Sequence, residues 1–221
     1  MNVADRQQPI TLDVWADIAC PWCFIGHRHL DAVIPRGAET DEGVVVVHRA
    51  YELQPDMPPR GRPAAGFFEE LFGGPEKVRE IHARVAEAGR SVGIAFDFEA
   101  MPIVPNTMLA HRAIALVTDP AIQRNAVEAM FSAYFEQGLD ITDPLVVVRA
   151  VSSATGMDPT ELSAALERGD GTEAVLGDFA ESRQLGISAV PTFVADRRTA
   201  VQGAQPPQVL RGFIDQALAS A

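Results

Sequence analysis

The sequence has few cysteines, no long apolar run and no excess of basic residues. Only two cysteines occur in 221 residues, so a single disulfide is the most that the chain can form within itself. No apolar stretch approaches the roughly 20 residues that a membrane-spanning helix needs. Acidic residues outnumber basic ones by 30 to 18, and the net charge of −12 repels phosphate backbones and anionic lipids. We therefore expect neither nucleic acid nor a membrane as a partner.

The N-terminal sequence MNVADRQQPITLDVW lacks the basic segment and apolar run of a signal peptide. We therefore expect a cytoplasmic protein, in a compartment where thiols stay reduced and a lone structural disulfide would add little. With 47% hydrophobic residues, the chain is long and apolar enough to bury a full core.

The first fifty residues predict a strand, a helix and a second strand. Apolar residues alternate in ITLDVW (residues 10–15), which is a strand pattern. FIGHRHLDAVI (24–34) follows with apolar residues on one helical face, and Pro35 ends it. The β-branched run GVVVVHRAYEL (43–53) predicts a strand that is buried on both faces. This order predicts a parallel βαβ unit.

Residues 54–171 differ in character and predict five or six helices. A Pro-rich connector, DMPPRGRP (56–63), precedes them. Pro75 stands where a first helical residue is expected, and the pairs Asp119-Pro120 and Asp143-Pro144 have the same pattern. DPTE (158–161) is a variant of the capping box and predicts another helix start.

Strand character returns after a helix that we expect to end near Gln184. VPTFVADRRTAVQG (190–203) contains two apolar runs separated by three polar residues, which predicts a hairpin, and AQPPQVLRGFIDQALA (204–219) predicts a closing helix. We therefore expect an α/β protein with the order β-α-β, helical block, α-β-β-α. Residues 1–53 and 172–221 would form one domain, into which residues 54–171 are inserted as a helical domain.

Both cysteines lie in DIACPWCFIG (17–26), after the first strand and at the start of the first helix. A Cys-x-x-Cys in this position is typical of a dithiol–disulfide redox centre. The free N–H groups and about half a positive charge at a helix N-terminus favour a thiolate. We expect Cys20 to be the exposed nucleophile and Cys23 the resolving thiol, more buried and higher in pKa. Pro21 suits the first helical position.

Six blocks carry a resemblance to a known family: DIACPWCFIG, HRAYELQPDMP, PNTMLAHRAI, FSAYFEQGLDITDP, GISAVPTFV and VQGAQPP. In content and order the chain resembles the DsbA-like branch of the thioredoxin superfamily, and within it the FrnE-like group of dithiol–disulfide oxidoreductases. The resemblance implies a thioredoxin fold with inserted helices, thiol–disulfide exchange at Cys20 and Cys23, and a cis Pro191. Taken alone, Pro191 before a strand favours a trans turn. In such a redox centre the backbone of Val190 pairs with an extended substrate.

The partners that this resemblance implies are protein or small-molecule thiols and disulfides. No cofactor beyond the redox-active disulfide is expected, and a homodimer is the default because many relatives form dimers. DsbA-type oxidases carry a His where Trp22 stands, so we expect this protein to be less oxidising. The direction of the reaction stays open.

Two alternatives also stay open. Kappa-class glutathione transferases and 2-hydroxychromene-2-carboxylate isomerases share the inserted helices, bind glutathione and typically carry Ser at the position of Cys20. Because this chain has both Cys20 and Cys23, we favour the redox interpretation and keep glutathione as an alternative co-substrate. The second alternative is a non-catalytic thiol-binding or chaperone module.

A zinc site is disfavoured, and we expect no metal. Its four ligands would all lie on one helix, whereas such sites usually draw ligands from two elements. Its candidate members are Cys20, Cys23, His27 and His29. We expect both histidines to be solvated, and Asp17 to close a turn rather than relay a proton.

Further candidate substrate contacts are Trp22 and three residues of PNTMLAHR (105–112). Trp22 lies between two reactive sulfurs, which predicts a partly exposed ring that contacts substrate. Asn106 or Thr107 is a natural N-cap, and capping is the default interpretation. The functional alternative is that Asn106, His111 and Arg112 line the groove over the dithiol, where Arg112 suits a carboxylate.

Overall fold

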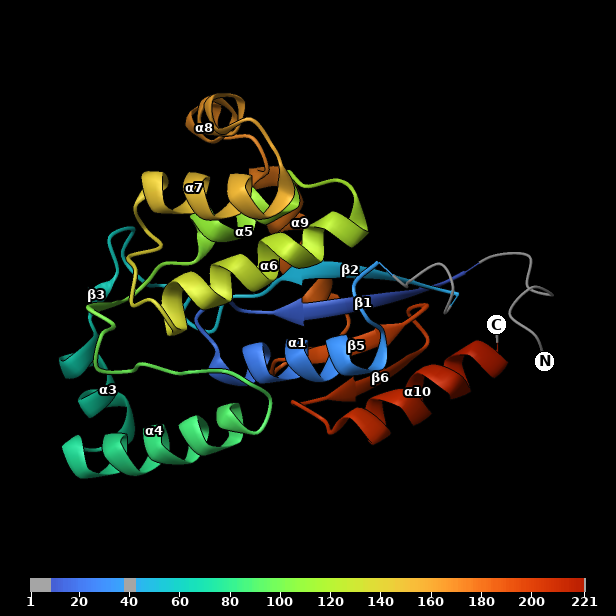
Figure 1. Cartoon of the computed structure of the whole chain (residues 1–221), viewed down its shortest axis with the longest axis horizontal. Coiled ribbons are helices and arrows are strands. Elements are labelled where there is room, and N and C mark those ends of the chain that lie inside the picture. The colour runs from blue at the N-terminus through green and yellow to red at the C-terminus, as the bar shows by residue number, and fades with distance from the viewer. Residues whose placement is uncertain (1–8, 38–42, 221) are drawn as a thin grey trace.

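The computed structural model describes residues 9–37 and 43–220 and contains one central sheet with helices on both faces (Figure 1). The sheet has four strands in the order β2-β1-β5-β6. Their bounds are β1 Ile10–Ala16, β2 Val44–Ala50, β5 Thr192–Ala195 and β6 Thr199–Gln202. β1 pairs with β2 in parallel, whereas β5 runs antiparallel to both β1 and β6. Strands from the two ends of the chain therefore meet in one sheet, and the predicted α/β class is confirmed.

Helices cover both faces of this sheet. α1 (Pro21–Val33) and α10 (Pro207–Ala219) pack on one face. The core there consists of apolar side chains from both helices and three strands, among them Ile10, Leu12, Leu30, Val46, Phe193 and Ile214. α9 (Thr172–Gln184) lies against the opposite face, where the indole N–H of Trp15 donates to the Asp178 carbonyl at 3.4 Å. Alternation along β1 thus directs successive side chains to α1 and to α9.

Between β2 and α9, the described residues form six helices and a small two-stranded sheet, in agreement with the prediction of five or six helices. The bounds are β3 Arg62–Pro63, α3 Ala64–Phe72, α4 Pro75–Arg90, β4 Ile103–Val104, α5 Met108–Ala115, α6 Pro120–Phe135, α7 Pro144–Thr155 and α8 Pro159–Arg168. These helices share a core with α1, since Phe24 stacks on Phe131 with ring centroids 5.0 Å apart. The division into two domains at residues 53/54 and 171/172 stays a prediction.

Three of these helices begin at Asp-Pro pairs, as predicted. A side-chain oxygen of Asp119, Asp143 and Asp158 accepts the N–H two residues further on, at 3.0, 2.9 and 2.8 Å. Proline follows each of them as a first helical residue. A side-chain cap of this kind stabilises a helix by about 1 kcal/mol. Local sequence therefore sets where α6, α7 and α8 start.

The prediction that β2 is buried on both faces is wrong. Alternate residues of β2 are buried, and those between them are partly exposed. The reason is that β2 is an edge strand of the sheet. On one face α9 reaches its carboxyl end, where Asp178 Oδ2 accepts the Ala50 N–H at 2.9 Å. Along the edge, α6 supplies Gln123, whose Oε1 accepts the His48 N–H at 3.0 Å.

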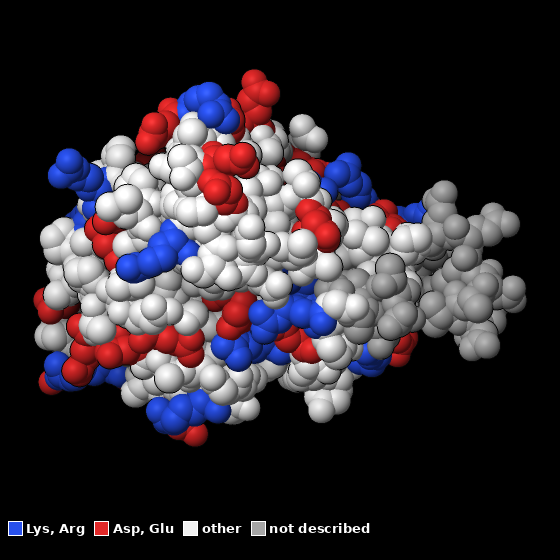
Figure 2. All heavy atoms as spheres, turned by 45° about the horizontal axis from the view of Figure 1, so that its top comes forward, with Lys and Arg blue, Asp and Glu red and all other residues white. Residues whose placement is uncertain are grey.

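The described part of the chain contains no helix that is both long and apolar enough to cross a membrane. On the face shown in Figure 2, basic side chains lie among acidic ones instead of gathering into a basic surface. That mixture accompanies a net charge of −12 for the whole chain. The expectation that nucleic acid is not a partner stays a prediction.

Candidate functional site

Cys20 and Cys23 lie at the start of α1, one helical turn apart. β1 ends at Ala16, and after a short turn Cys20 takes the N-cap position with extended backbone angles (φ −99°, ψ 112°). Its carbonyl accepts the N–H groups of Cys23 at 3.0 Å and Phe24 at 3.3 Å, which begins the helix. Pro21 is the first helical residue, as predicted. Both cysteines are free thiols.

The two thiols are less accessible than the sequence suggested. Cys20 is 5% exposed and Cys23 is 1% exposed. The prediction of an exposed Cys20 is therefore wrong, although Cys23 is the more buried of the two, as predicted. The reason is that Val190 packs against the core that contains both cysteines. Trp22 is 38% exposed, as predicted, and is the part of the motif that is open to solvent.

The segment before β5 lies directly beside Cys20. The Cys20 Sγ is 4.0 Å from the carbonyl oxygen of Val190, and the Val190–Pro191 peptide bond is cis. The Gly203 N–H donates to the Pro191 carbonyl at 2.7 Å and ties this segment to the end of β6. On the side of α1, a Cβ on Gly26 would lie only 2.8 Å from Pro191 Cγ. Helix and segment approach this closely because residue 26 has no side chain.

The surroundings of Cys23 favour the thiol over the thiolate. Burial raises the pKa of Cys23 well above its ordinary value, and the adjacent Cys20 raises it further. The charge of the Asp17 carboxylate acts in the same direction, whereas a hydrogen bond from the Asp17 backbone opposes it. Cys23 therefore keeps its proton unless a neighbouring base removes it.

Asp17 closes the turn before Cys20, as predicted, and also joins a buried polar group. Its Oδ1 accepts the Ala19 N–H at 3.0 Å and its Oδ2 accepts the Leu53 N–H at 2.8 Å. His111 from α5 places Nε2 3.8 Å from Asp17 Oδ1 and 3.0 Å from the carbonyl oxygen of Tyr51. Asp17 and His111 are both at least 95% buried.

Two further carboxyl groups lie near His111. Burial raises the pKa of Glu52, and the charge of His111 lowers it while that of Asp17 raises it again. Burial likewise raises the pKa of Asp178, against the opposing effects of the Ala50 N–H, Arg49 and His111. Sequence patterns indicated Asp17, before Cys20, and His111, in the block PNTMLAHRAI, as candidates. They did not indicate that these groups meet, because the residues come from four separate segments.

Asn106 and Arg112 contact the backbone of the inserted helices. Thr107 takes the N-cap position of α5 without a side-chain hydrogen bond, and one residue earlier the Asn106 Oδ1 accepts the Met108 N–H at 3.0 Å. Arg112 donates to the carbonyls of Leu166 at 2.5 Å and Asp170 at 3.1 Å, at the end of α8. These contacts are structural, and a substrate-binding role of Asn106 and Arg112 stays a prediction.

An apolar cavity of about 140 Å³ lies beside Pro21. Its wall is formed mainly by α3 and the segment after β4, and includes Phe67, Phe68, Leu71, Phe72 and Val104. Leu53 and Leu71 at this cavity are exposed to solvent. A volume of 140 Å³ is below the roughly 300–1,000 Å³ of a typical small-molecule site, so it suits one apolar side chain.

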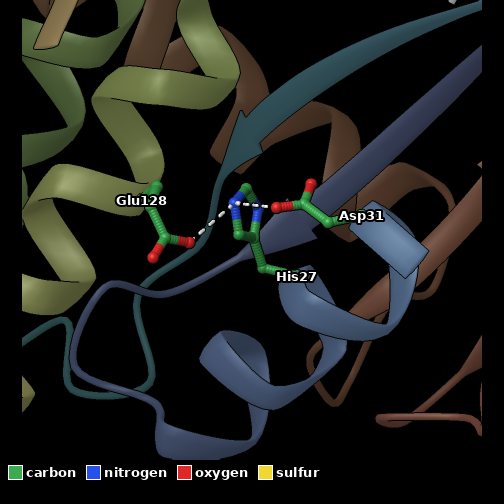
Figure 3. A group of neighbouring side chains, drawn as sticks. All are labelled: His27, Asp31 and Glu128. Atoms are coloured by element: carbon green, nitrogen blue, oxygen red, sulfur yellow. Dashed lines mark ion pairs between the residues drawn. The ribbon is translucent and has the colours of Figure 1, made fainter. Parts of the chain in front are cut away.

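The prediction that His27 and His29 are solvated is wrong for His27. His27 is 2% exposed and lies between α1 and α6, where it faces Asp31 and Glu128 (Figure 3). His29 lies elsewhere on α1, with Nδ1 2.8 Å from the carbonyl oxygen of Gln205. The two histidines therefore do not converge on the cysteines. Glu128 comes from a distant helix, so the motif alone contained no signal for this arrangement.

Known proteins share this architecture over nearly the whole chain. A model of the DSBA-like thioredoxin domain family matches residues 11–215. YwbO of Bacillus subtilis (strain 168) is 21% identical over 186 residues, which cover 84% of this chain and 86% of YwbO. The probable DsbA oxidoreductase SCO1869 of Streptomyces coelicolor is similar in structure, with a TM-score of 0.83 and 27% identity; the match covers 96% of this chain and 91% of that one.

Two more distant solved structures share the fold. A 2-hydroxychromene-2-carboxylate isomerase has a TM-score of 0.69 and 14% identity, and the match covers 95% of this chain and 97% of that one. Cytosolic disulfide reductase DsbM from Pseudomonas aeruginosa, with GSH, has a TM-score of 0.63 and 19% identity, over 95% and 99% of the two chains. The predicted thioredoxin fold with inserted helices is thereby confirmed. The family model matches residues 11–215, which include residues of all four strands of the central sheet. The chain therefore belongs to the DSBA-like thioredoxin domain family.

Proposed function

We propose that the protein is a dithiol–disulfide oxidoreductase that acts by thiol–disulfide exchange at Cys20 and Cys23. The observation that carries the proposal is the pair of free thiols at the N-terminus of α1, one turn apart. Their surroundings support different roles, because Cys20 adjoins Val190 whereas Cys23 lies deeper and keeps its proton. Membership of a family of DsbA-like domains supports redox chemistry at this position.

In the reducing direction, the reaction takes two steps. The Cys20 thiolate attacks one sulfur of a substrate disulfide, forms a mixed disulfide and releases the other substrate sulfur as a thiolate. Cys23 then loses its proton and attacks Cys20 Sγ. The intramolecular disulfide forms, and the second substrate sulfur leaves and is protonated. Two electrons pass to the substrate, and the reverse sequence makes a disulfide in a dithiol.

Asp17 is our candidate for the base that takes the proton from Cys23. It is 2% exposed and close enough for its charge to raise the pKa of Cys23. The two backbone N–H groups that it accepts leave lone pairs free, since an ionised carboxylate has about four acceptor positions. His111 beside it would stabilise the carboxylate between turnovers.

The surface around Cys20 suits an extended segment with an apolar side chain. We propose that the substrate pairs with the backbone of Val190 next to Pro191 and contacts the exposed ring of Trp22. The 140 Å³ cavity beside Pro21 would accept an apolar side chain that adjoins the reacting cysteine. Arg112 donates to two backbone carbonyls at the end of α8, and it would contact substrate only if it gave up these hydrogen bonds.

A glutathione-dependent transferase or isomerase is the alternative function. It is supported by the shared fold of proteins whose names include an isomerase and a reductase with GSH. The pairing of Cys23 with Cys20 favours exchange, in which glutathione would be a small thiol substrate. We further propose a FrnE-like, cytoplasmic enzyme that needs no metal or nucleotide for the redox step.

The test is equilibration in glutathione buffers of graded redox poise, followed by alkylation of free thiols and intact-mass measurement. We expect Cys20 and Cys23 to interconvert as one two-electron couple. Cys20→Ser should abolish exchange, and Cys23→Ser should accumulate mixed disulfides. If no intramolecular disulfide forms and glutathione instead stays bound to a protein that no longer needs Cys23, the transferase alternative replaces this proposal.

A further inference from the structure

Away from the cysteines, three side chains between α1 and α6 hold buried ligand atoms close together, with the His27 ring between Asp31 and Glu128 (Figure 3). His27 and Asp31 lie one turn apart on α1, and Glu128 projects from α6. The His27 Nε2 is 3.3 Å from Glu128 Oε2 and 3.7 Å from Asp31 Oδ2. One ligand atom from each of the three residues lies within 4.8 Å of the other two.

Among the residues that the structure describes, none of these three atoms has a hydrogen-bond partner. His27 Nε2, Asp31 Oδ2 and Glu128 Oε2 are all buried from solvent. The His27 side chain is only 1% exposed, so bulk water does not satisfy it. Protein interiors leave few polar atoms unpaired, and an unpaired atom calls for a bound ion or water. These three atoms lie in ion-pair contacts, with each other and with Arg36, but make no hydrogen bond of good geometry, and one bound ion would satisfy all three.

Arginines hold the outer oxygens of both carboxylates. Arg124 Nη2 donates to Asp31 Oδ1 at 2.5 Å, and Arg28 Nη2 lies 2.5 Å from Glu128 Oε1. Outer contacts of this kind commonly orient the carboxylates of metal sites. Arg36 Nε, at 3.0 Å from Asp31 Oδ2, competes for one inner oxygen. The positive charge of these arginines lowers the affinity for a cation, so we expect moderate rather than tight binding.

A further imidazole lies beside the site, since the ring centroid of His48 is 5.4 Å from that of His27.

We propose that His27, Asp31 and Glu128 bind a divalent transition-metal ion of the zinc class. One imidazole and two carboxylates are ligands that zinc accepts, with a fourth position left for water. Two ligand atoms at about 2.1 Å from a tetrahedral ion lie about 3.4 Å apart. The observed 3.3 Å and 3.7 Å are close to that value. Mg²⁺ and Ca²⁺ are disfavoured because they prefer oxygen ligands, whereas one of the three donors here is an imidazole nitrogen.

The ion would join the helix that begins with the cysteines to the inserted helices. Cys23, His27 and Asp31 follow one another at intervals of four residues, along one side of α1. Glu128 belongs to α6, whose Gln123 accepts from the edge of β2. The site therefore has a structural role, and it does not depend on the proposed redox reaction.

The experiment titrates zinc chloride into the full chain carrying Cys20→Ser and Cys23→Ser, because the thiols themselves bind zinc. We expect one equivalent to bind by isothermal titration calorimetry, and the melting temperature to rise with zinc. Adding His27→Gln or Glu128→Gln should lower the affinity at least tenfold. The matched control is His29→Gln, on the same helix, which should bind like the parent. Binding that is absent at 1 mM zinc, or unchanged by His27→Gln, overturns the proposal.

A second measurement locates the ion without a change at the site. Crystals of the same double variant grown with zinc chloride are measured on both sides of the zinc absorption edge. An anomalous peak between His27 Nε2 and Glu128 Oε2 supports the proposal. Anomalous peaks confined to other positions, or none at all, refute it even if the His27→Gln variant fails to fold.

Discussion

Gly26→Ala tests whether the contact between α1 and the segment before β5 positions the redox centre. The added Cβ would lie 2.8 Å from Pro191 Cγ, whereas ordinary contact begins at 3.4 Å. The proline ring or the helix must therefore move by about 0.6 Å. Pro191 adjoins Val190, whose carbonyl contacts Cys20 Sγ, so the displacement acts directly on the sulfur and the backbone to which we assign nucleophilic attack and substrate pairing.

The change in stability is expected to be small. Overpacking a core typically costs about 1–3 kcal/mol. Replacing a helical glycine by alanine returns roughly 1 kcal/mol. The net loss therefore lies between about zero and 2 kcal/mol, which corresponds to a fall in melting temperature of at most about 8 °C. The larger effect is on the rate of thiol–disulfide exchange, since misplacing a reacting group by 1 Å can slow a reaction about a hundredfold.

The assay measures, by stopped flow, the rate at which the reduced protein exchanges with a peptide disulfide. We expect exchange by Gly26→Ala to be about tenfold slower than wild type, in proportion to the smaller displacement. The control is Gly212→Ala in α10, where a Cβ meets no atom within 4 Å. It should gain stability and keep the wild-type rate. Wild-type exchange by Gly26→Ala would refute the positioning role of this contact.

Three further predictions follow from the site and its surroundings. Asp17→Asn should slow resolution by Cys23 about a hundredfold, so that mixed disulfides accumulate in intact-mass spectra while Cys20 still reacts. His48 has a pKa held well below its ordinary value, mainly by burial. The unfolded chain therefore takes up a proton first, stability falls as pH drops through the ordinary value near 6.5, and His48→Leu should flatten this dependence in urea titrations. Arg112→Gln should lower the free energy of unfolding by about 1.5–3 kcal/mol, because it removes hydrogen bonds from a charged group, and should leave the rate of thiol–disulfide exchange unchanged. Slower exchange at unchanged stability would instead support a substrate-binding role of Arg112.

Local sequence was enough to place the motif and most element boundaries. Pro21 takes the first helical position because this preference depends on the backbone of one turn, and Cys20 before it therefore lies at the N-cap. The Asp-Pro pairs set helix starts for the same reason. The hairpin turn is also local, since Asp196 and Arg197 adopt positive φ angles between β5 and β6.

Predictions about accessibility failed where packing between distant segments decided it. Cys20 is buried because Val190, 170 residues further on, packs beside it. His27 looked like a surface residue because its partner Glu128 stands on another helix. Similarly, the β-branched run of β2 did not indicate that β2 would be an edge strand. Periodicity identifies an apolar face, but not which element covers it.

The sequence by itself determined where the two thiols lie relative to each other, because a Cys-x-x-Cys at a helix start needs only one turn of backbone. Its apolar pattern also determined the order of strands and helices. Only the tertiary structure decided which groups surround the thiols: Asp17 and His111 come together across nearly a hundred residues. The physical reason is that burial and charge act through space, and folding alone brings those separations below 4 Å.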